Sequence, residues 1–297
     1  MDKKEINNFF WKNGYVVLRN IYSDEQIQRY RKFIKKNIEE LVGKGKKNWK
    51  DLEIIKNRDV LSYPELRDSI LNKNLLDSIK SIFENEDFYY WGYSTFRYNE
   101  KSYRSVHNDA KNDYQNPFKT PYPLLRIGIY LQDHKNFSNG LKVFKGSCHS
   151  LKYGRTMLKK ILKEKEFRYL IPQQIKPINI DTMPGDVVIW NLRTCHSGNA
   201  LRLKYFKNIT LKPYMENFLQ KYFPNIFLEN ERERAVIFAT FGKMGKPLKN
   251  FIKNNLNHIE ISSLIKNSNF LNREIISISE KLGLKLLDIE EIKKELP

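Results

Sequence analysis

Cysteine is scarce in this sequence, with Cys148 and Cys195 as the two in 297 residues. Two cysteines cannot build the disulfide framework on which small secreted domains depend. A chain of this length can bury a substantial hydrophobic core without covalent cross-links. We therefore expect a protein of the reducing cytoplasm.

Long apolar runs are also missing. No stretch of 18 consecutive apolar residues occurs, and the first residues, MDKKEINNFFWKNG, contain no apolar run of signal-peptide length. The sequence therefore predicts a soluble chain without a membrane span. Because 40% of the residues are hydrophobic and 13% are aromatic, the composition also excludes a disordered chain.

Acidic residues are fewer than basic ones: the chain has 34 Asp and Glu against 53 Lys and Arg, and its net charge is +19. The basic residues are spread along the chain and form no run of five or more. That distribution argues against a nucleic-acid-binding segment. A general enrichment in Lys, Asn and Ile explains part of the excess, and the remainder favours a small anionic substrate.

Apolar periodicity divides the chain into parts. In segment 23–45 the apolar residues have helical spacing after Ser23, a typical helix N-cap. Segment 64–84 has the same spacing and begins with Pro64, a residue favoured at the first position of a helix. A short apolar strand, 14–22, precedes both. The strands that we predict beyond them are short, aromatic and β-branched: 88–99, 124–133, 141–146, 178–192 and 234–242. Segment 274–296 returns to helical spacing.

The order of these elements indicates the fold class. Several short strands without regular intervening helices favour an antiparallel jelly roll over a doubly wound sheet. We therefore expect one β-rich α+β domain over residues 1–297. Its predicted parts are a mostly helical segment 1–87, a jelly-roll core 88–242 and a helical segment 243–297.

The segment RSVHNDAKND, residues 104–113, contains a candidate for metal binding. In an extended chain His107 and Asp109 point to one face, and Asn108 points away, at a position that we expect to be replaceable. A second histidine, His196, follows the predicted strand GDVVIWNL directly. Two imidazoles and one carboxylate form the facial triad of non-haem Fe(II) oxygenases, which leaves metal positions open for co-substrate and O2.

Other interpretations of these residues are possible, and other histidines are candidates for the metal ligands. About 0.6 His-x-Asp/Glu matches are expected in a chain of this composition, so a polar loop would also explain the tripeptide. His196 would also serve as a core or cap residue. His134 and His149 lie near strand ends and stay open as alternative ligands.

Polar side chains on other predicted strands are candidates for binding a co-substrate. Arg234 opens the strand RAVIFATFG, where its guanidinium would form a bidentate pair with a carboxylate. A salt bridge to the adjacent Glu231 or Glu233 is the alternative. Thr95, on the strand before the metal motif, would line a pocket or belong to an aromatic core.

Four motifs occur in this order along the chain: FFWKNGYVVLRNIYSDEQI, VHNDA, LRIGIYLQDHKNFSNGLKVFKGSCHS and MPGDVVIWNLRTCHSGNA. Together they resemble the phytanoyl-CoA dioxygenase-like branch of the Fe(II)/2-oxoglutarate oxygenases. The resemblance covers most of residues 5–242 and keeps the family's order of elements. The resemblance implies a double-stranded β-helix, the jelly roll of cupin-like enzymes.

The resemblance also implies a chemistry for the site. His107, Asp109 and His196 would bind Fe(II), 2-oxoglutarate would chelate the metal, and O2 would be consumed with release of succinate and CO2. Halogenating relatives lack the metal-binding carboxylate. Since Asp109 is present, the implied reaction is hydroxylation of a C–H bond in a small organic or lipid-like substrate.

This sequence departs from the family in the position of the arginine that binds 2-oxoglutarate in the relatives. It usually lies closer to the distal histidine, whereas Arg234 lies 38 positions after His196. We therefore interpret residues of about 200–231 as an insertion, with Arg202 and Arg232 as alternatives to Arg234. Ser197 is a further candidate contact of the co-substrate, unless it only shapes the turn.

Two other functional classes remain open at this stage. One is a non-catalytic jelly roll that serves as a binding module. The other is a cupin-like metalloenzyme that does not use 2-oxoglutarate. The sequence does not indicate the substrate's identity or the oligomeric state.

Overall fold

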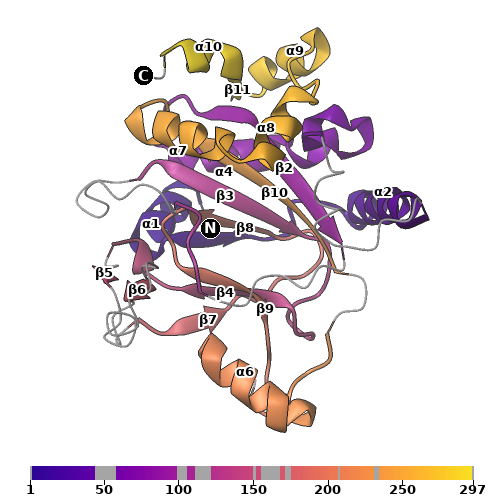
Figure 1. Ribbon diagram of the computed structural model, residues 1–297, viewed down its shortest axis with the longest axis vertical. Helices are drawn as coiled ribbons and strands as arrows, with labels where there is room; N and C mark the ends of the chain where they lie inside the picture. The colour runs from indigo at the N-terminus through magenta and orange to yellow at the C-terminus, as the bar shows by residue number, and fades with distance from the viewer. Residues whose placement is uncertain are drawn as a thin grey trace.

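Two β-sheets face each other at the centre of the computed structural model (Figure 1), which describes residues 2–43, 58–98, 106–110, 122–149, 152–154, 168–170, 175–206, 208–230 and 234–295. The larger sheet has six strands in the order β1-β8-β3-β10-β2-β11, and the smaller has three in the order β7-β4-β9. The strands of the larger sheet are β1 (Tyr15–Leu18), β8 (Val187–Asn191), β3 (Leu124–Tyr130), β10 (Ala235–Gly242), β2 (Tyr89–Tyr98) and β11 (Lys285–Leu286). Those of the smaller sheet are β7 (Pro177–Asn179), β4 (Gly140–Phe144) and β9 (His196–Ala200). The two facing sheets, antiparallel apart from the β11–β2 pair, confirm the predicted jelly-roll core.

The strands of the larger sheet are apolar on both faces because both faces are covered. Their inward side chains, among them Val188 and Val236, pack with Leu141 and Val143 of the smaller sheet. Their outward side chains pack against helices in a second cluster, which includes Ile237. A strand buried on both sides needs no polar alternation, which explains continuous runs such as VVIW in β8.

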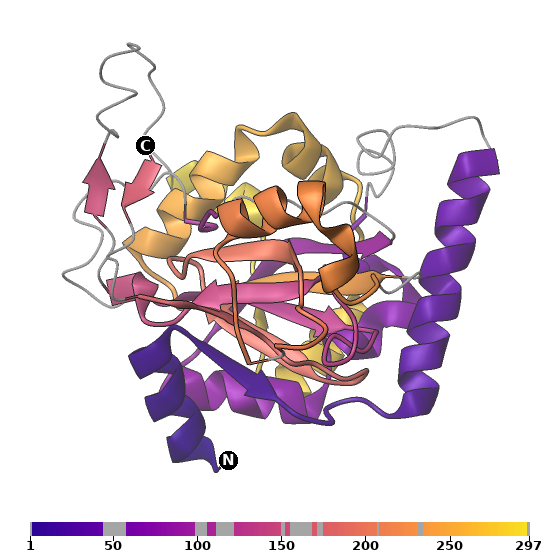
Figure 2. The same ribbon diagram turned by 90° about the horizontal axis from the view of Figure 1, so that it is seen from below.

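The N-terminal helices cover the outer face of the larger sheet. These are α1 (Lys3–Asn13), α2 (Asp24–Gly43) and α4 (Lys73–Ile82), and Figure 2 shows α1 and α2 at opposite sides of the sheet. The helical spacing predicted for α2 is confirmed, since Ile27, Tyr30, Ile34 and Ile38 are buried. The predicted helix 64–84 is divided, however, into a 3-10 segment, η2 (Pro64–Ser69), and α4. Asn72 causes the break, because its side chain accepts a hydrogen bond from Leu75 N and caps a new helix.

One predicted strand, 178–192, is two strands in different sheets. A turn separates β7 from β8, with Gly185 at a φ of 94° and Asp186 accepting a hydrogen bond from Met183 N. A β-carbon at Gly185 would also lie 2.6 Å from the Tyr22 carbonyl oxygen. The Pro-Gly-Asp motif therefore carries the chain from one sheet to the other, which apolar patterning alone does not reveal.

The C-terminal helices lie beside the far end of the larger sheet (Figure 1). They are α7 (Lys246–Leu256), α8 (Ile259–Lys266), α9 (Arg273–Lys281) and α10 (Ile289–Glu295). The predicted helical segment 274–296 is interrupted by β11, which pairs in parallel with β2 after Gly283 ends the preceding turn at a φ of 73°. Phe270 and Ile275 of the C-terminal part share one hydrophobic cluster with Phe10 and Ile237.

The segment between β9 and β10, predicted as an insertion, contains α6 (Pro213–Tyr222) and a 3-10 turn, η4 (Pro224–Ile226). It lies beside the smaller sheet, at the lower end of the molecule in Figure 1. A separate two-stranded pair, β5 (Lys152–Gly154) and β6 (Arg168–Leu170), projects from the same half. No helix of the described residues is long and apolar enough to cross a membrane.

Candidate metal centre

The two histidines of the predicted triad are brought together by a backbone bridge. His107 N donates to His196 O over 3.0 Å, and His196 N donates to His107 O over 2.8 Å. The residues thus form an antiparallel pair that extends the smaller sheet beyond β9. Their rings lie side by side, with centroids 4.3 Å apart.

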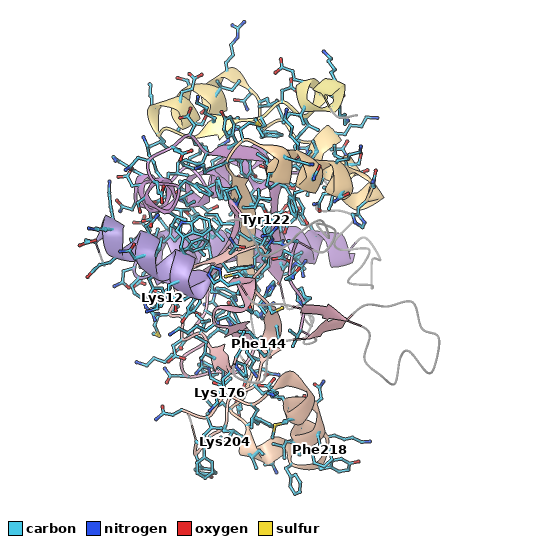
Figure 3. All side chains as sticks on the ribbon, turned by 90° about the vertical axis from the view of Figure 1, so that its left-hand side faces the viewer. Lys12, Tyr122, Phe144, Lys176, Lys204 and Phe218 are labelled. Carbon is cyan, nitrogen blue, oxygen red and sulfur yellow. The ribbon has the colours of Figure 1, made fainter. Side chains whose placement is uncertain are left out.

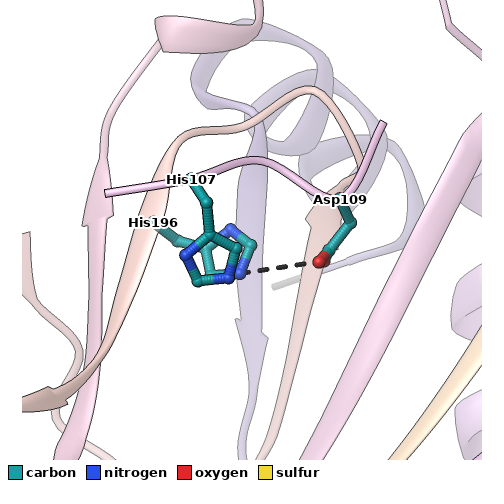
Figure 4. A group of neighbouring side chains, drawn as sticks. All are labelled: His107, Asp109 and His196. Atoms are coloured by element: carbon teal, nitrogen blue, oxygen red, sulfur yellow. Dashed lines mark ion pairs between the residues drawn. The ribbon is translucent and has the colours of Figure 1, made fainter. Parts of the chain in front are cut away.

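Asp109, two residues after His107, brings its carboxylate close to the two imidazoles. Its amide donates to Leu192 O over 2.9 Å, which fixes the segment against the end of β8. Each of His107, Asp109 and His196 offers a ligand atom within 4.8 Å of the others (Figure 4). Among the described residues this is the group with metal-binding spacing, and it contains neither His134 nor His149.

Neighbouring groups orient the ligands. His196 Nδ1 lies 3.0 Å from Thr194 O, a contact that places the proton on Nδ1 and leaves the Nε2 lone pair available. That Nε2 is 3.7 Å from Asp109 Oδ2. Trp190 Nε1 donates to the same Asp109 Oδ2 over 3.0 Å. The site therefore has the orienting hydrogen bonds that metal ligands require.

The electrostatic surroundings keep Asp109 ionised. Burial by itself raises the pKa of this carboxyl, but the positive charge of Arg126, the two histidines and the Trp190 hydrogen bond outweigh it. The pKa therefore lies well below its usual range, and Arg126 Nη1 is 3.4 Å from Asp109 Oδ1. An ionised carboxylate and two imidazoles form a donor set that fits Fe(II).

The turn that carries His196 is held against the N-terminal segment. Thr194 Oγ1 donates to Gly14 O over 2.6 Å, and Asn191 N donates to the same oxygen over 2.9 Å. Gly14 has a φ of 78°, and a β-carbon there would lie 2.4 Å from Thr194 Oγ1. Glycine at this position therefore allows the close approach that positions His196.

Arg234 lies immediately before β10 and faces the interior between the sheets. It shares strand parity with Val236 and Phe238, which pack in the cluster between the two sheets. The side chain is 4% exposed, and its Nε donates to Asn139 O over 3.1 Å. Its charge, after the larger effect of burial, helps to lower the pKa of His134 to about 3, so that this imidazole is neutral.

Arg202 and Arg232 are the other candidates for the arginine that would bind 2-oxoglutarate. Arg202 is paired with Asp181, a surface carboxylate whose side chain is 50% exposed. Arg232, with its neighbours Glu231 and Glu233, lies outside the described residues. Of the arginines that can be compared, Arg234 is therefore the one whose position on a core strand fits the prediction.

Thr95 and Ser197, the two hydroxyl residues predicted to contact the co-substrate, lie in different environments. Thr95 pairs with Phe238 of β10, so it faces the interior, and its buried Oγ1 has no hydrogen-bond partner among the described residues. Ser197 instead pairs with Lys142, while its neighbour His196 pairs with the inward-facing Val143. Adjacent residues of a strand face opposite ways, so Ser197 lies on the face opposite to His196, and its contact with the co-substrate stays a prediction.

Two residues near the metal ligands were missed by the sequence analysis. Arg126 and Trp190 are Cα partners on β3 and β8, and both contact Asp109. A signal for Arg126 was present, because a charged residue interrupts the apolar run LLRIGIYL. Trp190 carried no such signal, since an aromatic residue in an apolar strand is most often core.

Other residues singled out in the sequence have structural roles. His149 Nε2 donates to Trp11 O over 2.6 Å, and Cys195 is buried beside Phe144 with the pKa of its thiol raised by burial. Asn108 is 0% exposed. The expectation that Asn108 is replaceable rested on its side chain pointing away from the metal face. Its burial adds a packing constraint that strand parity does not reveal.

Two solved structures share the fold. AviO1 from Streptomyces viridochromogenes Tue57 is 14% identical with a TM-score of 0.52, over 83% of this chain and 97% of that one. The epimerase SnoN, in complex with Fe3+, alpha ketoglutarate and nogalamycin RO, is 12% identical with a TM-score of 0.50, over 81% and 83%. The search among curated protein sequences gave no match.

A sequence model of the family described as phytanoyl-CoA dioxygenase (PhyH) matches residues 10–202. This segment spans more than half of the chain and contains all three side chains of the triad. The match ends before Arg234 and before most of residues 200–231, the segment that we interpret as an insertion. The predicted resemblance is confirmed: the protein belongs to the phytanoyl-CoA dioxygenase family of Fe/2-oxoglutarate-dependent oxygenases.

Proposed function

We propose that this protein is an Fe(II)- and 2-oxoglutarate-dependent dioxygenase that hydroxylates a C–H bond of a small organic or lipid-like substrate. Succinate and CO2 would be released. The observation that carries the proposal is the convergence of His107, Asp109 and His196 within 4.8 Å of one another in a family of such enzymes. The retained carboxylate of Asp109 supports hydroxylation, because it occupies the metal position that a halide would need.

Each residue of the site has a separate part in this chemistry. His107, Asp109 and His196 would hold Fe(II), which with 2-oxoglutarate and O2 supplies the oxidising power for C–H cleavage. Trp190 holds one carboxylate oxygen of Asp109 by a 3.0 Å hydrogen bond, and Arg126 lies beside the other. These contacts keep the carboxylate ionised and fixed in orientation before metal binds.

Binding of 2-oxoglutarate would use the interior face of the larger sheet. Arg234 offers a buried guanidinium that can pair with the carboxylate remote from the metal. Thr95, on the neighbouring β2, offers an inward hydroxyl and pairs with Phe238 of β10. Arg234 directly precedes the same strand. We therefore assign these two residues to the co-substrate.

Positive charge in the interior supports an anionic substrate. Arg97 and Arg126 both lie over the Phe238 ring, with guanidinium carbons 5.6 and 5.1 Å from its centroid. Arg126 of β3 forms an ion pair with Asp109, and Arg97 belongs to β2. A substrate carboxylate or phosphate would therefore meet a favourable potential on entering.

Anaerobic loading with Fe(II), followed by addition of 2-oxoglutarate and O2, tests the reaction class. We expect succinate formation that requires Fe(II) and rises when a metabolite extract supplies substrate. The fold is shared with an epimerase, so mass spectrometry of the extract must show a product heavier by one oxygen atom. Wild-type protein that forms no succinate even with extract would favour a binding module or a cupin-like enzyme without 2-oxoglutarate.

Replacement of Arg234 by alanine is expected to raise the KM for 2-oxoglutarate by about 10- to 100-fold, the value of a charge-assisted pair to a carboxylate. Arg202→Ala is the matched control, because that guanidinium is paired with the half-exposed Asp181. It should change this KM by less than about threefold. Steady-state succinate production at varied 2-oxoglutarate measures both variants, and a larger effect from Arg202→Ala would show that the insertion was aligned wrongly.

A further inference from the structure

Large hydrophobic side chains are exposed along the segment between β9 and β10. Seven of the eleven such side chains in the described part of the chain lie within residues 205–223. We call them the apolar tip: Tyr205, Phe206, Ile209, Met215, Phe218, Tyr222 and Phe223. Their exposed fractions range from 40% to 82%. Single exposed hydrophobic residues are normal, but a cluster of this kind marks a surface that another phase or molecule covers.

Helix α6 cannot bury this face by turning inward, because its other face is already engaged. Glu216 is 0% exposed and forms an ion pair with Lys142 of β4. Leu219 packs against a small cluster that contains Leu203 and Phe227. The remaining face presents Phe218 and Tyr222, whose ring centroids are 5.0 Å apart, away from the domain.

Lysines predominate among the charged residues of the segment that contains the apolar tip. Residues 203–228 contain four lysines and a single acidic residue, Glu216, which is buried in its ion pair. Lys221 is exposed, with its ammonium 5.2 Å from the Tyr222 ring centroid. Lys204 and Phe218 lie at the same end of the molecule (Figure 3). The segment therefore combines exposed aromatic side chains with lysines. Among its described residues from 203 to 228 the one carboxylate is buried, and the next carboxylate along the chain, Glu229, is exposed.

We propose that the apolar tip docks this protein on an anionic phospholipid surface. Phenylalanine, tyrosine and methionine side chains enter the boundary between headgroups and acyl chains, while nearby lysines are attracted to anionic headgroups. The net charge of +19 acts in the same direction at longer range. A second copy of the chain fits less well, because a two-fold contact would bring identical lysines together.

Co-sedimentation of the full-length chain with two kinds of vesicle tests this proposal. We expect strong binding to phosphatidylcholine vesicles that contain about one third phosphatidylglycerol, weak binding to pure phosphatidylcholine, and loss of binding at high salt. The variant Phe218→Ser/Tyr222→Ser should reduce partitioning about tenfold or more. Lys212→Glu/Lys221→Glu should reduce it about fivefold or more on the anionic vesicles.

Ile278→Ser provides the matched control, since Ile278 is 37% exposed on α9 among the C-terminal helices, far from α6 (Figure 1). Its vesicle binding should equal that of the wild type. Light scattering after size-exclusion chromatography tests self-association in parallel. Absence of binding to anionic vesicles, equal loss in the control, or a dimer abolished by Phe218→Ser/Tyr222→Ser without vesicle binding would each overturn the proposal.

Discussion

Alanine in place of His107, Asp109 or His196 is expected to lower Fe(II) affinity by more than about 100-fold and to abolish succinate formation. Each substitution removes one of three ligand atoms that lie within 4.8 Å of one another. Changes to groups that merely orient metal ligands already cost about 10- to 100-fold in affinity, so loss of a ligand should exceed that range. Iron stoichiometry after anaerobic loading and desalting measures the effect directly.

The three variants differ in what they leave behind. Asp109→Ala removes the acceptor of the Trp190 hydrogen bond and the anion beside Arg126, so it should also lower thermal stability. Asp109→Asn retains the side-chain shape and separates that effect from loss of the metal. His258→Ala, at an exposed position before α8, is the matched control and should bind iron normally. Wild-type iron content in all three ligand variants would refute the triad.

Replacement of Lys142 by methionine is expected to lower the free energy of unfolding by about 3–5 kcal/mol. Lys142 and Glu216 are both 0% exposed and form an ion pair between β4 and α6. Lys142 Nζ also donates to Leu211 O over 2.5 Å, and Glu216 Oε1 accepts from Leu201 N over 3.1 Å. Loss of the cation leaves a buried carboxylate without its counter-charge, a large cost against a typical total stability of about 5–15 kcal/mol.

Urea unfolding of the single and double variants checks this expectation. Glu216→Leu should be destabilised by a similar amount, whereas Lys142→Met/Glu216→Leu should recover much of the loss, because neither charge then remains buried. Lys221→Met changes an exposed lysine of the same helix and should shift stability by less than about 0.5 kcal/mol. A strictly additive double variant would mean that the two side chains act independently.

The structure brings the three predicted metal ligands together, and the sequence signal for two of them is local. His107 and Asp109 are two residues apart, and strand geometry puts such residues on one face. His196 follows a strongly apolar strand that is easy to recognise. The family motifs then connected the two halves across 89 positions, and the structure joins them through the His107–His196 backbone bridge.

Sequence patterns were insufficient where a contact between distant segments decided the outcome. Ser197 was expected at the co-substrate, which stays a prediction, and only the pairing of β9 with β4 shows that it lies on the same face as Lys142, the partner of Glu216 on α6. Segment 178–192 was expected as one strand, and the Gly185 turn instead distributes it between two sheets. Local propensity contains no information on which sheet a strand joins, because that depends on its partners.

The amino-acid sequence was sufficient to predict the β-rich class, the apolar faces that form the core, and the residue types of the candidate metal site. Those properties follow from periodicity and side-chain chemistry, which act over a few residues. Three-dimensional packing was needed to show that Arg126 and Trp190 contact Asp109, that Lys142 and Glu216 bury their charges together, and which residues form the apolar tip. Each depends on packing between segments far apart in the chain, where burial and charge pairing are set by three-dimensional proximity.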